Sequence, residues 1–147
     1  MTAQQANNSS SALDGGALDR DRPLRLALRL DAAASGALGV LLAAGGALLD
    51  DLLGIPAGVL VPVGGFLILY AAGLWLLGSR SPVSRPAVWV VAIGNLGWVA
   101  ASVVAAAAGW WSPTAAGTAF VLVQAAAVVV FAELQLSGLR RARSAGA

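Results

Sequence analysis

The chain has 147 residues, of which 59% are hydrophobic and only 11% are charged. Soluble domains carry about 25% charged residues, so a soluble fold of this size could not cover its surface with polar groups. The high hydrophobicity also excludes a disordered chain, and the composition predicts a helical integral membrane protein.

The residue types that are missing restrict the chemistry open to this chain. It contains no Cys and no His, and all nine of its basic residues are Arg. This excludes disulfides, thiolate metal sites, histidine general bases and Schiff-base lysines. We therefore expect a protein that is not an enzyme, with no catalytic residue, no cofactor and no metal. The sequence lacks the basic stripe that nucleic-acid binding needs, so we expect no nucleic-acid partner.

The first residues of the chain, 1–22, are polar and rich in Ser, Ala, Asn and Gln. They lack the positive stretch and apolar core of a signal peptide, and they predict a disordered cytoplasmic tail. Helix signals begin around Asp21, and Pro23 suits a first helical turn. The membrane domain is expected over residues 23–139, followed by a basic cytoplasmic tail at 140–147.

Four apolar spans divide this domain, at about residues 26–49, 57–77, 87–109 and 114–136. Each is close to the 20 or so residues that a helix needs to cross the hydrocarbon layer. One long helix could instead fill the uncharged interval between Arg85 and Glu133, but Gly109 and Pro113 argue against it. Short connections between antiparallel helices predict an all-α, four-transmembrane-helix, up-down-up-down bundle.

The arginines predict the orientation of this bundle. They precede the first span, lie between the second and third, or follow the fourth, whereas the other two connections contain none. All nine therefore fall on one side, which the positive-inside rule makes cytoplasmic. We expect a multi-pass protein of the plasma membrane with both termini in the cytoplasm. Trp110 and Trp111 would then lie at the outer interface, and Trp75 and Trp89 near the inner one.

Two rows of small residues recur at four-residue spacing in the first and third spans. They are Ser35, Gly39, Ala43 and Ala47, and Ala101, Ala105 and Gly109. Such rows allow helices to approach closely in lipid. They indicate either a dimer face or packing within the bundle, and the abundance of Ala favours packing within the bundle.

Polar residues inside the spans are the candidates for a functional site. They are Asp31, Ser35, Asn95, Trp98, Gln124, Glu133 and Gln135. Helical phase places Asp31 with Ser35 on one face, and Asn95 with Trp98 and Ser102 on another. Gln124 and Gln135 also align, whereas Glu133 points about 180° away from Gln124.

These residues admit two interpretations. They could line a polar pocket open to the cytoplasmic half of the bundle, with Asp31 as counter-ion for a cation or an amphiphile. They could instead be hydrogen-bonded between helices, with Asp31 paired to Arg25 or Arg29 and Glu133 to Arg140 or Arg80. We expect Tyr70 to be a packed residue whose hydroxyl has a partner.

Three segments carry a resemblance to a known group of proteins. They are Arg29-Leu30-Asp31-Ala32, Asn95-Leu96-Gly97-Trp98-Val99, and Phe131-Ala132-Glu133-Leu134-Gln135 running into Gly138-Leu139-Arg140-Arg141. With these segments the chain resembles small four-helix integral membrane proteins common in actinobacteria, a family whose biochemical role is unknown. The resemblance covers about residues 24–141. It implies a bacterial membrane protein with a four-helix fold, and it transfers no active residues.

Two functions are consistent with these patterns. The first is a non-enzymatic accessory or interaction protein that acts through helix contacts, with a second copy or another membrane protein as partner. The alternative is a binder or transporter of a small molecule or lipid that uses the polar pocket. Membrane lipid is a partner in both.

Overall fold

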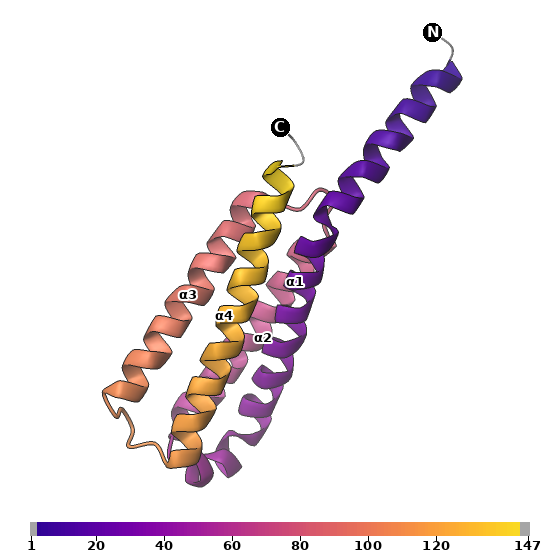
Figure 1. Ribbon diagram of the computed structural model, residues 1–147. Coiled ribbons are helices and arrows are strands. Elements are labelled where there is room, and N and C mark those ends of the chain that lie inside the picture. The colour runs from indigo at the N-terminus through magenta and orange to yellow at the C-terminus, as the bar shows by residue number, and fades with distance from the viewer. Residues whose placement is uncertain (1–2, 145–147) are drawn as a thin grey trace.

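The computed structural model describes the backbone of residues 3–144 and the side chains of residues 21–141. Its helices are α1 (Ala3–Leu53), α2 (Ala57–Ser79), α3 (Arg85–Ala107) and α4 (Ala115–Ser144). Successive helices run antiparallel, and both ends of the chain lie at the same end of the bundle, here called the terminal end (Figure 1). This confirms the predicted all-α, up-down-up-down architecture.

The helices have the length and apolarity of membrane spans. Apolar stretches that could cross a bilayer occupy Asp21–Leu53, Ala57–Ser79, Arg85–Ala107 and Ala115–Arg141. The shortest have 23 residues, or about 35 Å at 1.5 Å per residue, against a hydrocarbon layer of about 30 Å. Large apolar side chains such as Leu48 and Leu69 are exposed on the outside of the bundle, where lipid would surround them. The chain is a multi-pass membrane protein.

The start of the first helix differs from the sequence prediction. The backbone is helical from Ala3, so residues 3–20 extend α1 where a disordered tail is expected, and Pro23 lies inside the helix and not in its first turn.

The bundle is held by three extensively packed pairs of helices, α1 with α2, α1 with α4, and α3 with α4. The backbones of α1 and α2 approach closely, since a Cβ atom built on Gly39 would lie 2.8 Å from the carbonyl oxygen of Gly64. A Cβ atom on Gly64 would in turn meet the backbone of Ala43. The small-residue row of the first span is thus used for packing within the bundle.

Two apolar cores lie towards the two ends of the bundle. The core near the terminal end is formed by Leu24, Leu28, Ala32, Leu74, Val83, Val88 and Leu139. The core near the opposite end is formed by Leu42, Leu53, Ile55, Leu60 and Leu67. The layer between them contains the polar side chains, so apolar packing fixes the helices on both sides of the candidate site.

Hydrogen bonds tie the connections to α1. At the terminal end, a carboxylate oxygen of Asp21 accepts a bond of 3.0 Å from the backbone N–H of Val83, in the α2–α3 connection. At the opposite end, the N–H of Thr114 donates to the carbonyl of Leu53 at 3.0 Å, and the Thr114 hydroxyl caps α4 by accepting from the N–H of Gly117. These bonds fix the relative rotation of α1, α3 and α4.

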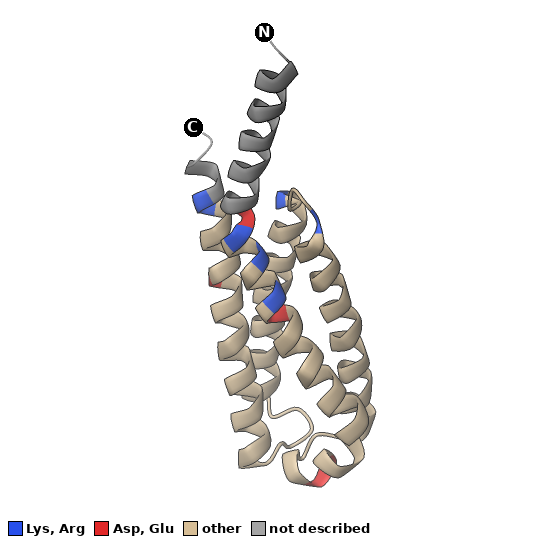
Figure 2. Cartoon of the chain, turned by 90° about the vertical axis from the view of Figure 1, so that its right-hand side faces the viewer, with Lys and Arg blue, Asp and Glu red and all other residues tan. Residues whose placement is uncertain are grey.

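Charged residues are separated between the ends of the bundle. Figure 2 shows the described arginines towards the terminal end, and an acidic group at the opposite end, where the α1–α2 connection lies. Asp50, near the end of α1, accepts from the N–H of Ala57 at 3.0 Å with its carboxylate and so caps α2. The predicted segregation of charge therefore holds for the described side chains.

Candidate functional site

A network of polar side chains from all four helices surrounds the carboxylate of Asp31. One of its oxygens accepts a bond of 3.0 Å from the hydroxyl of Ser35, one turn further along α1. Its other oxygen accepts from Asn95 of α3 at 2.9 Å and from Gln135 of α4 at 2.8 Å. The hydroxyl of Tyr70, on α2, donates to Asn95 at 2.7 Å. The carboxylate thus links α1, α3 and α4 directly, and Asn95 connects it to α2.

The Asp31 network is almost completely closed to the surroundings. The exposed fractions are 1% for Asp31, 0% for Gln135 and 4% for Asn95. A buried carboxylate is costly in a membrane, and donors from Ser35, Asn95 and Gln135 compensate that cost here. This arrangement matches the interpretation as interhelical hydrogen bonding.

The arginines expected to pair with Asp31 lie elsewhere. The guanidinium of Arg25 donates to the backbone carbonyl of Arg80 at 3.0 Å, in the α2–α3 connection. The guanidinium carbon of Arg29 lies 5.6 Å from the centre of the Trp75 ring, which is a cation–π contact. Neither of the two arginines named for a pair with Asp31 therefore contacts its carboxylate in this way. Arg29 precedes Asp31 by two residues and so points to a different side of α1.

A second polar group lies nearer the middle of the bundle. The indole N–H of Trp98 donates to the side-chain oxygen of Gln124 at 2.9 Å, and the amide nitrogen of Gln124 donates to the hydroxyl of Ser102 at 3.0 Å. This group joins α3 to α4, as the shared face of Trp98 and Ser102 predicts.

Aromatic rings form a row between α2 and α3. The ring of Phe66 lies almost parallel to the rings of Tyr70 and Trp98, at centre-to-centre distances of 6.1 and 6.0 Å, with 14° between the planes in both pairs. Although α2 and α3 are consecutive in the chain, they are not one of the extensively packed pairs. The row of aromatic rings and the Tyr70–Asn95 hydrogen bond are contacts that join α2 to α3.

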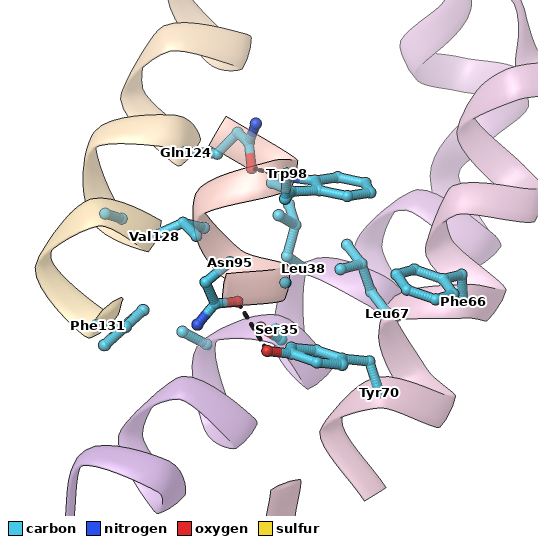
Figure 3. A pocket seen from close by; sticks show the side chains of 13 residues that line it. Ser35, Leu38, Phe66, Leu67, Tyr70, Asn95, Trp98, Gln124, Val128 and Phe131 are labelled. Carbon is cyan, nitrogen blue, oxygen red and sulfur yellow. Dashed lines mark hydrogen bonds between the residues drawn. The ribbon is translucent and has the colours of Figure 1, made fainter. Parts of the chain in front are cut away.

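Two cavities lie beside these side chains. The first, the Asn95 cavity, has a volume of about 150 Å³. Its labelled side chains come from all four helices, and the hydroxyl of Tyr70 points to Asn95 at its edge (Figure 3). The second, the Trp110 cavity, has a volume of about 220 Å³ and extends to Trp110 and Trp111 in the α3–α4 connection. The two cavities share Leu38, Leu67, Trp98 and Gln124 as lining residues, so they adjoin.

The structure divides the residues of the predicted pocket into three groups. Ser35, Asn95, Trp98 and Gln124 line the Asn95 cavity. Asp31 and Gln135 lie outside its lining, because their polar atoms are used in the buried network. Glu133 is exposed on the outer surface of α4, as its phase relative to Gln124 predicts. The expectation that Asp31 lines an open pocket as counter-ion is wrong for this reason.

Several residues that line the Asn95 cavity, among them Phe66, Gly94 and Phe131, are not among the predicted site residues. Phe66 and Tyr70 are four residues apart, a spacing that places two side chains on one face of a helix, and this signal could have identified Phe66. Gly94 is adjacent to Asn95 in a helix, but its place on the cavity wall depends on the rotation of α3.

The small-residue row of the third span borders a cavity at two of its three positions, whereas Gly109 is exposed and has open space around it. Ala101 and Ala105 line the Trp110 cavity opposite side chains of α1, α2 and α4. Small side chains at these positions leave space that larger residues would fill. In the described part of the chain, then, both rows contribute to the interior of the bundle.

This arrangement can hold an apolar molecule and form a few hydrogen bonds to it. Among the described residues, no group of three or more acidic side chains could hold a metal ion. Comparison of the chain with protein-family models, with curated proteins and with solved structures finds no match. Any function must therefore be argued from the cavities and their lining.

Proposed function

We propose that this protein binds a small apolar or amphiphilic membrane molecule in the two adjoining cavities. One observation carries the proposal: the cavities are lined by all four helices, and polar groups from Tyr70, Asn95, Trp98 and Gln124 converge on one part of an otherwise apolar lining. Ligand sites in proteins commonly combine a mostly apolar concave surface with a few placed polar groups, and helix bundles are one of their usual locations.

Contacts with the cavity lining supply the affinity in this proposal. An apolar cavity of about 150 Å³ in another protein stays dry and binds benzene, so the Asn95 cavity has room for a ring of that size. In the membrane, a ligand leaves lipid and not water, so contacts with the lining and hydrogen bonds must favour the cavity. The polar side chains supply the selectivity.

The proposal is tested by a pair of glycine substitutions on α3. Gly94 lines the Asn95 cavity, and a Cβ atom added there meets nothing within 4 Å. Gly94→Leu should therefore fill the cavity without disturbing the backbone. We expect molecules that accompany the wild-type protein into native-lipid discs to be lost from this variant, as measured by mass spectrometry of the released compounds.

Gly97→Leu is the matched control. Gly97 lies three residues further along α3, also has open space around an added Cβ atom, and lines neither cavity. Both substitutions remove a helix glycine, so both should raise helix propensity by a similar amount, up to about 1 kcal/mol. Equal amounts of the same bound compounds in both variants would contradict the proposal.

We also propose that the protein is not an enzyme and that its terminal end faces the cytoplasm of a bacterial plasma membrane. The arginines at this end support the orientation. Because the chain contains no Cys, a single introduced cysteine can report the orientation of the protein in the membrane. We expect Ser112→Cys, in the α3–α4 connection, to react with an impermeant maleimide in intact cells, and Ser84→Cys to react only after lysis. The reverse labelling would contradict the orientation.

One observation favours the accessory or interaction function as a second candidate. Glu133 is exposed on a face of α4 that also exposes Val130 and Leu134, within an apolar span. An acidic side chain there is costly unless a partner helix or the interface satisfies it. If a partner does so, Glu133→Gln should weaken recovery of that partner in mild detergent. Unchanged recovery would remove this candidate.

A further inference from the structure

The polar lining of the cavities has hydrogen-bond donors to spare. A glutamine amide carries two N–H groups, and Gln124 uses one of them to reach Ser102. The second finds no acceptor among the described residues, and neither does the hydroxyl proton of Ser102. Gln124 lines both cavities, but its nitrogen points away from Asn95 (Figure 3) and reaches Ser102, which lines the Trp110 cavity. Both donors therefore lie where the Trp110 cavity begins. A ligand that carries a hydrogen-bond acceptor would satisfy them.

The charges near the cavities favour a neutral ligand. No charged side chain belongs to the lining of either cavity. The nearest carboxylate in the network, Asp31, is buried behind Ser35 and Asn95 and is bonded to three donors. A charged head group would therefore enter the bundle without a counter-ion, which is strongly unfavourable.

The aromatic lining of the Asn95 cavity favours a flat ring. Its wall includes the parallel rings of Phe66, Tyr70 and Trp98, and Phe131 lines it from α4. Aromatic rings gain from offset stacking beyond the area that they bury, which an acyl chain does not. The volume of about 150 Å³ suits a single six-membered ring.

The Trp110 cavity suits a linear tail. Apart from Ser102, Gln124 and the indole N–H groups, its lining is aliphatic or aromatic. It adjoins the Asn95 cavity at Trp98 and Gln124, so a ring bonded to Gln124 could continue as a chain towards Trp110.

We propose that the ligand is a neutral molecule with a flat, carbonyl-bearing ring and an apolar tail, which is the chemistry of a membrane quinone. The ring occupies the end of the Asn95 cavity that adjoins the Trp110 cavity, and a ring carbonyl at this junction accepts from the second N–H of Gln124. The tail occupies the Trp110 cavity. This inference rests on the proposed function, since it names the class of ligand for the same cavities.

Three probes with the same ten-carbon chain test the inference. They are a decyl-substituted benzoquinone, decylbenzene, which has the ring without the carbonyls, and decyl acetate, which has a carbonyl without the ring. Each is added to the full-length wild-type protein in lipid discs, and the retained probe is counted by native mass spectrometry. We expect the quinone to be retained at one molecule per chain, and the other two to be retained more weakly.

Gln124→Met identifies the contact. It keeps a side chain of similar length but removes the amide donor, and we expect about fivefold weaker retention of the quinone with little change for decylbenzene. Gly97→Leu should retain the quinone as the wild type does. If Gln124→Met fails to fold, the comparison of the three probes on the wild type still decides the ligand class.

The outcomes separate this inference from the proposed function. Equal retention of the three probes, or preferential retention of decyl acetate or decylbenzene, would overturn the quinone class and leave an apolar ligand site in place. If none of the three is retained and the protein from native membranes carries no bound molecule, both proposals are wrong.

Discussion

At the scale of single residues, Asp31 shows how a costly group can determine a structure. Its two oxygens accept hydrogen bonds from Ser35 of α1, Asn95 of α3 and Gln135 of α4. Hydrogen bonds within membrane bundles are each worth only about 0.6 kcal/mol on average. The network nevertheless selects one rotation of α1, α3 and α4, because any other rotation would leave the carboxylate unsatisfied.

Replacing this carboxylate should destabilise the bundle. Asp31→Asn substitutes an N–H₂ group for one acceptor oxygen, so at least one donor of the network loses its partner. We expect the free energy of unfolding in mixed micelles to fall by about 1–3 kcal/mol. Glu133→Gln is the matched control, since it also removes one acidic charge but at an exposed position, and it should change stability by less than about 0.5 kcal/mol. Equal effects of the two substitutions would show that the network does not stabilise the fold.

At the scale of helices, α1 and α2 form the most extensively packed pair in the bundle. Gly39 and Gly64 allow the two backbones to approach so closely that a side chain at either position would meet backbone atoms of the other helix. By contrast, α2 and α3 meet chiefly through side chains, at Phe66–Trp98 and Tyr70–Asn95. The cavities follow from this difference, because close packing of one pair leaves space beside the other.

Adjacent glycines on α2 provide a sharp test of this packing. A Cβ atom on Gly64 would meet the backbone of Ala43, whereas one on Gly65 has nothing within 4 Å. We expect Gly64→Ala to lower the free energy of unfolding by about 1–3 kcal/mol through overpacking. Gly65→Ala should leave stability unchanged or raise it by up to about 1 kcal/mol through helix propensity. Thermal unfolding of the two variants in one detergent would compare them, and a loss of similar size in both would contradict the α1–α2 geometry.

At the scale of the whole molecule, the composition and the helix-breaking Gly and Pro residues predict the four-helix bundle and its connections. Gly54, Pro56, Gly109 and Pro113 mark connections correctly, since a helix rarely continues through such residues at the end of a long apolar run. Helical phase also predicts which neighbours share a face on one helix, such as Trp98 with Ser102, because that spacing depends only on the 3.6-residue turn.

The site itself is less accessible to sequence reasoning. Which acceptor Asn95 meets, and whether Asp31 lies on a cavity or behind its wall, depends on how the four helices rotate and how closely each pair packs. One chain's residue pattern does not specify those rotations. The cavities are harder still to predict. They lie beside small residues such as Gly94, Ala101 and Ala105, but small residues are also frequent where two helices pack closely, so their presence does not distinguish a cavity from a contact.

The central claim is that the two cavities hold a ligand when the protein is in its membrane. A crystal structure of the protein extracted with its native lipids, with no ligand added, tests this most directly. We expect continuous electron density from the rings of Phe66 and Trp98, past Gln124, towards Trp110. Cavities without density, or α2 and α3 packed together so that the space between Asn95 and Trp110 is filled by side chains, would contradict the account.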